Sequence, residues 1–130
     1  MATRATYSFQ ATNAYQPMWI HTYIHYDGYP SGAAYNFKQT LELLEQGKDY
    51  RSKLRGNVAE QFLRANTLAE FTRSPDVHGD TEFHYEVSIG KNGPMLRAFE
   101  YDHEHNRLEF FNGTLVDFVA RYSEHPEPLC

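Results

Sequence analysis

The densest set of side chains that could do chemistry lies at residues 21–32, HTYIHYDGYPSG. Alternate side chains of an extended strand point to the same side, so His21, Tyr23, His25 and Asp27 would share one strand face. Imidazole and phenol groups donate hydrogen bonds and offer rings for stacking, and a face made of them is too polar for simple core. The stretch therefore predicts a polar pocket or an interface.

His21 and His25 are the first candidates for metal ligands in this stretch. Four residues of strand span about 13 Å, whereas the ligands of one zinc ion each lie about 2 Å from it. Regular strand geometry therefore forbids shared ligation, and we expect no metal and no other cofactor. A second His-rich run, DHEH at residues 102–105, is expected to be a solvated hairpin turn, because four neighbouring side chains diverge.

The turn DGYPSG at residues 27–32 precedes a predicted helix, and the free N–H groups of a helix start attract anions. Its glycines would let the backbone approach a phosphate. Asp27 would repel an anion unless it caps the turn itself, and the alternative is a plain tight turn with Ser31 as the helix cap. The candidate ligand-binding set is Arg4, His21, Tyr23, His25, Asp27, Gly28, Tyr29 and Ser31, in which Arg4 on the neighbouring strand adds positive charge.

Hydrophobic alternation and helical spacing predict the elements that position these side chains. Strands are expected at 3–10, about 19–26, 83–89, 95–101 and 107–111, and helices from Ser31 to Gly47, from a capping box at Asn57 to near Thr72, and after the cap Thr114. The order ββ–α–α–βββ–α defines an α+β fold. We expect a mainly antiparallel sheet of about five strands with helices packed on one face.

The chain of 130 residues fits one domain, which we place at 1–122, followed by a flexible tail at 123–130. No apolar run is long enough for a membrane span, and the N-terminus lacks the apolar region of a secretory signal. The single cysteine is Cys130, which excludes an internal disulfide. These features predict a soluble cytoplasmic protein, and the net charge of −5 argues against nucleic acid as a partner.

Acidic side chains gather in the last part of the chain, where residues 74–130 carry eleven acidic and four basic side chains. An acidic sheet face could bind a basic protein partner in a salt-dependent manner. The residues expected on such a face include Glu82, Glu86, Glu100 and Asp102. A solvated outer face of the strands is the alternative interpretation.

Three motifs together resemble small phage, prophage and bacterial proteins that have no assigned activity. The motifs are TRAT at residues 3–6, a YxHxDGYP turn that includes Tyr23, His25, Asp27 and Pro30, and GTL at residues 113–115. The resemblance touches both ends of the chain and leaves the middle unmatched. It implies an accessory protein of a mobile element, acting inside a bacterial host cell, and it implies no particular reaction.

We expect a non-enzymatic binding protein, since no catalytic motif is found. Its partner is expected to be a small anionic, nucleotide-like ligand, sequestered to counter a bacterial defence. One alternative is an acidic, anti-CRISPR-like inhibitor that blocks a host protein. A second alternative is a small His-dependent or metal-dependent hydrolase. Open strand edges also favour a homodimer.

Overall fold

The computed structural model describes residues 3–10, 18–46, 54–74, 81–90 and 93–123 of the chain. The elements in chain order are β1 (Ala5–Gln10), β2 (Trp19–Ile24), α1 (Pro30–Gln46), α2 (Leu54–Ala65), β3 (Glu70–Thr72), β4 (Phe83–Gly90), β5 (Gly93–Tyr101), β6 (Arg107–Thr114) and α3 (Leu115–Tyr122). The predicted α+β class is confirmed. The predicted flexible tail lies outside the described residues, apart from its first residue, Ser123.

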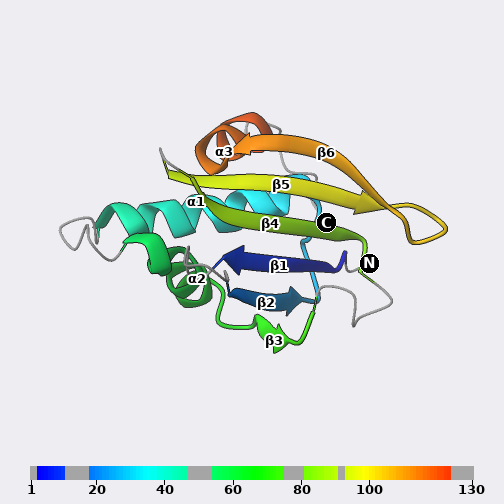
Figure 1. Ribbon diagram of the computed structural model, residues 1–130, viewed down its shortest axis with the longest axis horizontal. Helices are drawn as coiled ribbons and strands as arrows, with labels where there is room; N and C mark the ends of the chain where they lie inside the picture. The colour runs from blue at the N-terminus through cyan, green and yellow to red at the C-terminus, as the bar shows by residue number, and fades with distance from the viewer. Residues whose placement is uncertain (1–2, 11–17, 47–53, 75–80, 91–92, 124–130) are drawn as a thin grey trace.

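All six strands form one mixed sheet in the order β3-β2-β1-β4-β5-β6. The four pairs β1–β2, β2–β3, β4–β5 and β5–β6 are antiparallel, and β1–β4 is parallel. The prediction of about five strands missed β3. In the structure, the N-terminal hairpin joins the later strands through the parallel β1–β4 pair. This join places β1 in the middle of the sheet, between β2 and β4 (Figure 1).

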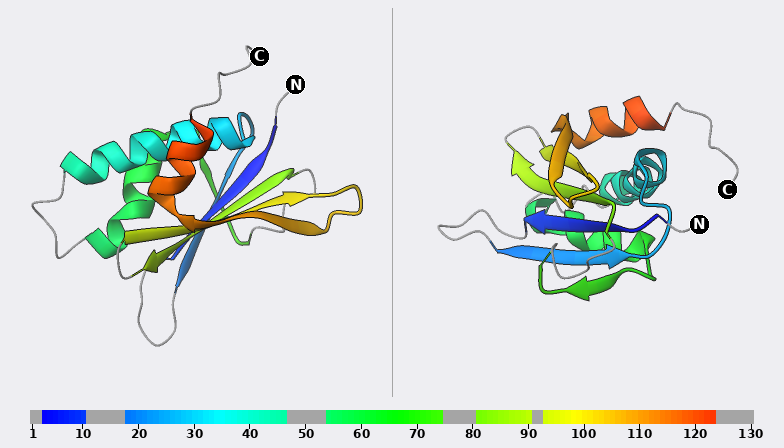
Figure 2. Two further views of the ribbon diagram at one scale, coloured as in Figure 1. Left: turned by 90° about the horizontal axis from the view of Figure 1, so that it is seen from above. Right: turned by 90° about the vertical axis from the view of Figure 1, so that its right-hand side faces the viewer.

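The helices pack on one side of the sheet, as predicted, and Figure 2 shows α1, α2 and α3 together on that side. The side chains of β1 alternate, so that Ala5, Tyr7 and Phe9 point into this layer. Tyr7 stacks on Tyr85 of β4 at 5.1 Å between ring centroids and meets Phe62 of α2 at 4.8 Å. The core is therefore built from aromatic rings, which offer large apolar area per residue.

Figure 2 also shows that the sheet is strongly twisted, because the β1–β2 pair and the β5–β6 pair run in clearly different directions. In Figure 1 the reader looks onto the sheet face that carries none of the three helices, with α1 passing behind the strands. We call this surface the open face. Any site on it is positioned by strand register alone.

Several predicted boundaries are wrong. Helix α1 begins at Pro30, where the fixed φ of proline suits the first helical position, so Ser31 lies inside the helix. Helix α2 begins at Leu54, three residues before the predicted cap Asn57, and ends at Ala65. Strand β6 continues through the expected stop at Asn112–Gly113, because Gly113 pairs with Leu96. The predicted cap Thr114 is confirmed, since its hydroxyl accepts a hydrogen bond from the Asp117 N–H at 3.0 Å.

A buried hydrogen bond ties the sheet to the turn before α1, and it yields a stability prediction. The Tyr85 hydroxyl donates to the carbonyl oxygen of Gly28 at 2.6 Å. We expect Tyr85→Phe to lower the free energy of unfolding by about 1 to 2 kcal/mol, because the buried carbonyl loses its partner. Urea unfolding of the purified variant measures this loss.

Tyr7 provides the matched control. Its hydroxyl is equally buried and lies near the Asn36 side chain, but it makes no hydrogen bond of standard geometry within the described part of the chain. Tyr7→Phe should therefore leave the unfolding midpoint unchanged or raise it. Equal losses for the two variants would contradict the assigned role of the Tyr85 hydroxyl.

Candidate functional site

The open face is organised as rows of side chains that run across the strands, and its two central rows hold most of the polar groups. Strand register aligns one row as Glu70, Tyr23, Thr6, His84, Phe99 and Glu109. The next row holds Thr72, His21, Ser8, Glu86, Arg97 and Asn112. The same register pairs Arg107 with Tyr101, next to the Phe99–Glu109 pair of the first row.

Two hydroxyl–imidazole pairs sit on either side of β1 in these rows. Thr6 Oγ1 lies 2.8 Å from Nδ1 of His84 on β4. Ser8 Oγ lies 2.6 Å from Nδ1 of His21 on β2. Each hydrogen bond at Nδ1 fixes the orientation of its imidazole ring, and the ring orientation in turn fixes the direction in which Nε2 points.

His84 is fully buried although no helix covers this face, and its Nε2 has no hydrogen-bond partner among the described residues. Nε2 faces a carboxylate oxygen, Oε2 of Glu86, at 3.6 Å. A lone pair at Nε2 would repel that oxygen, so Nε2 carries a hydrogen, and in the neutral ring Nδ1 accepts from the Thr6 hydroxyl. His84 thus presents a buried N–H donor without an acceptor at bonding distance. Such groups are rare in folded proteins and call for an explanation.

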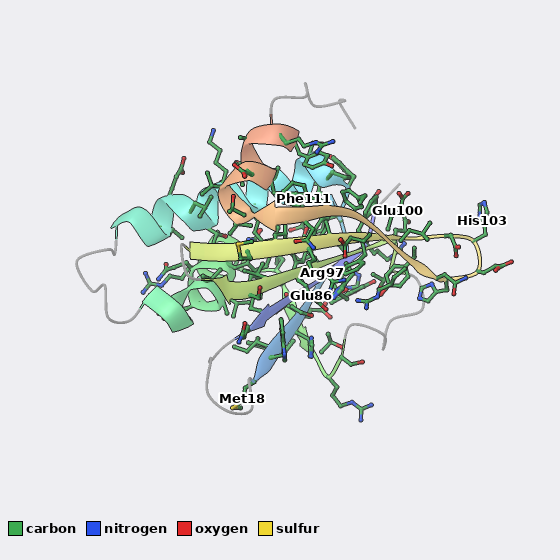
Figure 3. The ribbon with its side chains drawn as sticks, turned by 45° about the horizontal axis from the view of Figure 1, so that its top comes forward. Met18, Glu86, Arg97, Glu100, His103 and Phe111 are labelled. Atoms are coloured by element: carbon green, nitrogen blue, oxygen red, sulfur yellow. The ribbon has the colours of Figure 1, made fainter. Side chains whose placement is uncertain are left out.

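Two arginines complete the surroundings of Glu86. Arg107 Nη1 lies 3.8 Å from Oε2, and Arg97 Nη1 lies 3.8 Å from Oε1. Figure 3 labels Glu86 and Arg97, which lie next to one another on β4 and β5. We call His84, Arg97 and Arg107 around this carboxylate the Glu86 cradle. All three nitrogens lie beyond ordinary hydrogen-bond distance from the carboxylate, so the cradle surrounds Glu86 loosely.

The two arginines of the cradle differ in what else they bind. Arg97 donates from Nε and Nη2 to Oε1 of Glu109, at 2.9 Å and 2.7 Å. The Arg107 guanidinium lies over the Phe99 ring, 4.3 Å from its centroid, and its carboxylate contact among the described residues is the 3.8 Å one with Glu86. A guanidinium stacked on a ring keeps its N–H groups in the plane, where they can reach a ligand. Arg107 is therefore the cradle residue with the most donor capacity left.

The cradle lowers the pKa of Glu86 below the ordinary value of a glutamate. The His84 contact is the main cause, the charges of Arg107 and Arg97 add to it, and partial burial opposes it. A carboxyl with a lowered pKa adds stability above its unfolded pKa, and that stability is lost as the pH falls through the folded value.

This shift predicts how Glu86→Gln changes the pH dependence of stability. At pH 7 the variant should be less stable than the wild type. The difference should begin to shrink as the pH falls to roughly 4, near the pKa of an unperturbed glutamate, and it should vanish below the lowered pKa of folded Glu86. Urea midpoints measured from pH 7 to pH 3 check this. A difference that stays constant over the whole range would contradict the paired state of Glu86.

Enzymes with a nucleophilic hydroxyl also bond that hydroxyl to an imidazole, as Thr6 is bonded to His84 beside Glu86. The exposure of the hydroxyl decides whether Thr6 could act in this way. The attacking oxygen of such an enzyme must reach the substrate. Thr6 is 0% exposed and Ser8 is 1% exposed, so neither hydroxyl can meet a substrate in this conformation. The arrangement therefore favours binding over nucleophilic catalysis.

The structure divides the residues predicted from the HTYIHYDGYPSG stretch into two groups. His21 and Tyr23 lie on the open face within β2, as expected. β2 ends at Ile24, so His25 and Asp27 do not continue that strand face. His25 still packs edge-on against Tyr23, and its Nε2 lies 3.0 Å from Oε2 of Glu70 on β3. Within the described ranges, no group of three or more metal-ligating side chains converges.

The turn residues form the second group, and they fill the start of α1 with their own backbone. Asp27 has a positive φ of 54°, and its carbonyl oxygen would lie 2.2 Å from a Cβ added at Gly32. Gly28 also packs closely on Ala5, and a Cβ added to Gly28 would lie 2.6 Å from the Ala5 Cβ. The Tyr29 hydroxyl donates to Oδ1 of Asp27 at 3.4 Å. These close approaches explain both glycines by packing, without an anion.

Arg4 lies immediately before β1, where its carbonyl oxygen accepts hydrogen bonds from the N–H groups of Glu82 and Phe83. It therefore anchors β1 to β4 close to the open face. The members of the cradle were not among the predicted site residues. Alternation along β4 does place His84 and Glu86 on one face, but strand register was needed to bring Arg97 and Arg107 to them.

Comparisons with protein-family models, curated proteins and solved structures find no match for this chain. The described residues include no helix that is long and apolar enough to cross a membrane. The side chains of the open face, above all the Glu86 cradle, are therefore the basis for assigning a function.

Proposed function

We propose that this protein is a non-catalytic binding protein that holds a small anionic, nucleotide-like ligand on its open face. The observation that carries the proposal is the buried N–H donor of His84, whose nearest acceptor, the Glu86 carboxylate, lies 3.6 Å away and is shared with two guanidinium groups. Leaving a buried donor unpaired costs about 1 to 3 kcal/mol. A ligand oxygen that takes the place of the partly exposed Glu86 carboxylate would reach this N–H and supply a closer acceptor.

The aromatic groups of the same face support a ligand with a planar part. Trp19 of β2 is 39% exposed, and register places it on the open face with His21 and Tyr23. Exposed aromatic rings stack on nucleobases with little dependence on sequence. Phe99, by contrast, is covered by the arginines and serves as their platform.

The acidic side chains give less support to the alternative, a protein-blocking inhibitor. Glu86 is enclosed by the cradle, and Glu100 pairs with Phe83, whose side chain faces the helix layer. Asp102 accepts hydrogen bonds from the backbone N–H groups of Glu104 and Asn106 within its own turn. Glu86, Glu100 and Asp102 therefore do not form one continuous face.

The phage or prophage origin, the role against a bacterial defence, the cytoplasmic setting and the homodimer remain predictions. They derive from the resemblance of the TRAT, YxHxDGYP and GTL motifs and from the open strand edges. The small-ligand function proposed above does not depend on them.

Calorimetric titration with adenosine monophosphate and with adenosine tests the proposed function. We expect binding of the monophosphate, much weaker binding of adenosine, and a loss of monophosphate affinity in Arg107→Gln. Arg121→Gln, which removes the same charge at an exposed position of α3, is the matched control and should bind like the wild type. Equal affinities for both compounds, or no binding of either, would overturn the proposal.

A further inference from the structure

The Glu86 cradle has the composition of an anion site that is already occupied by a side chain of the protein. Three nitrogen donors from β4, β5 and β6 surround one carboxylate at 3.6, 3.8 and 3.8 Å. Charge-assisted hydrogen bonds normally bring nitrogen and oxygen to about 2.7 to 2.9 Å. The Glu86 carboxylate thus lies among the three donors without coming within hydrogen-bond distance of any of them, and Glu109 balances the charge of Arg97.

We infer that Glu86 occupies the binding position of a phosphoryl group, and that the phosphoryl group of the ligand displaces the Glu86 carboxylate when it binds. This inference rests on the proposed function and names the chemical class of the group held by the cradle. It also makes Glu86 a residue that sets affinity by competing with the ligand.

A phosphoryl group fits the donors better than a carboxylate does. A phosphate monoester offers three terminal oxygens, one for each donor group, whereas a carboxylate offers two. In the present arrangement Oε2 of Glu86 faces both His84 and Arg107, so two donors share one oxygen. The planar fork of Arg107 can bind two phosphate oxygens at once.

The Glu86 side chain has room to move out of the cradle when a phosphoryl group enters. Glu86 is partly exposed, with 27% of its side chain accessible, so its carboxylate can rotate toward solvent. Arg97 stays oriented by its two bonds to Glu109, and His84 stays oriented by Thr6. The donors of His84 and Arg97 therefore keep their positions when an anion binds, whereas the Glu86 carboxylate can move away.

Titration of inorganic phosphate into three proteins tests the inference. We expect Glu86→Gln to bind phosphate about tenfold more tightly than the wild type, because the negative charge that competes with phosphate for the cradle is removed. Glu100→Gln carries the same change in net charge on the other side of the sheet and should bind like the wild type. In the wild type, acetate should bind more weakly than phosphate.

The outcomes separate the inference from the proposed function. Phosphate binding by the wild type with no gain in Glu86→Gln over Glu100→Gln would overturn the inference alone. No binding of phosphate or of adenosine monophosphate by any of the three proteins would overturn both. If Glu86→Gln fails to fold, Glu86→Ala answers the same question, because it removes the same carboxylate and should likewise bind phosphate about tenfold more tightly than the wild type.

Discussion

Gly32→Ala should lower the free energy of unfolding by about 2 to 3 kcal/mol, although it replaces glycine by alanine inside a helix. The added Cβ would lie 2.2 Å from the Asp27 carbonyl oxygen and 3.2 Å from the Asp27 Cβ. Backbone atoms cannot swing aside as the end of a flexible side chain can. The turn would have to open, which would strain the neighbouring Gly28 contacts with Thr3 and Tyr85.

The sign of this effect makes it a sharp test. Without the contact to Asp27, the same substitution should stabilise the protein by about 1 kcal/mol, because alanine favours the helix over glycine. Ser31→Ala, one residue earlier in the same turn of α1, is the matched control and should change stability by less than about 0.5 kcal/mol. Chemical unfolding of the three proteins measures the difference, and a stabilised Gly32→Ala variant would refute the packing of the DGYPSG turn.

The double variant Thr6→Val with His84→Leu should abolish phosphate binding and leave stability within about 1 kcal/mol of the wild type. The substitutions replace both members of a buried polar pair by apolar groups of similar shape. The loss of binding follows from the loss of the Nε2 donor. Stability is kept because the unpaired donor disappears together with the Thr6–His84 hydrogen bond.

Thr6→Val alone is the informative comparison for this pair. It leaves Nδ1 of His84 buried without a partner and should cost about 1 to 2 kcal/mol. The double variant should therefore be more stable than the single one, which unfolding of both proteins can show. A double variant that unfolds as easily as the single variant would mean that His84 serves the fold rather than a ligand.

The sequence predicted the elements well where side-chain periodicity was clean. β1, β2, β4, β5 and α3 fall within a few residues of their predicted positions, because alternation or a clear cap marks each of them. β3 escaped prediction because it is three residues long and carries no alternation. The parallel β1–β4 pair escaped because pairing between distant strands leaves no signal in either strand alone.

The same limit explains the candidate site. His21 and Tyr23 were predicted because two polar rings alternate within one strand. The cradle joins β4, β5 and β6 through register, and a shift of one residue would turn Arg97 to the other face of the sheet. Alternation along β4 therefore placed His84 and Glu86 on one face, but the sequence could not show that Arg97 and Arg107 meet them, and it predicted the anion site at the DGYPSG turn instead.

Nitrogen NMR spectroscopy of the histidine rings during titration with adenosine monophosphate tests the central claim most directly. Our account predicts that the Nε2 resonance of His84 shifts and saturates together with the side-chain Nε resonance of Arg107, because the phosphoryl group binds between them. Resonances that shift instead at Gly28, Tyr29 and Ser31 would place the anion at the start of α1. That result, or unchanged His84 and Arg107 resonances at saturating nucleotide, would contradict binding on the open face.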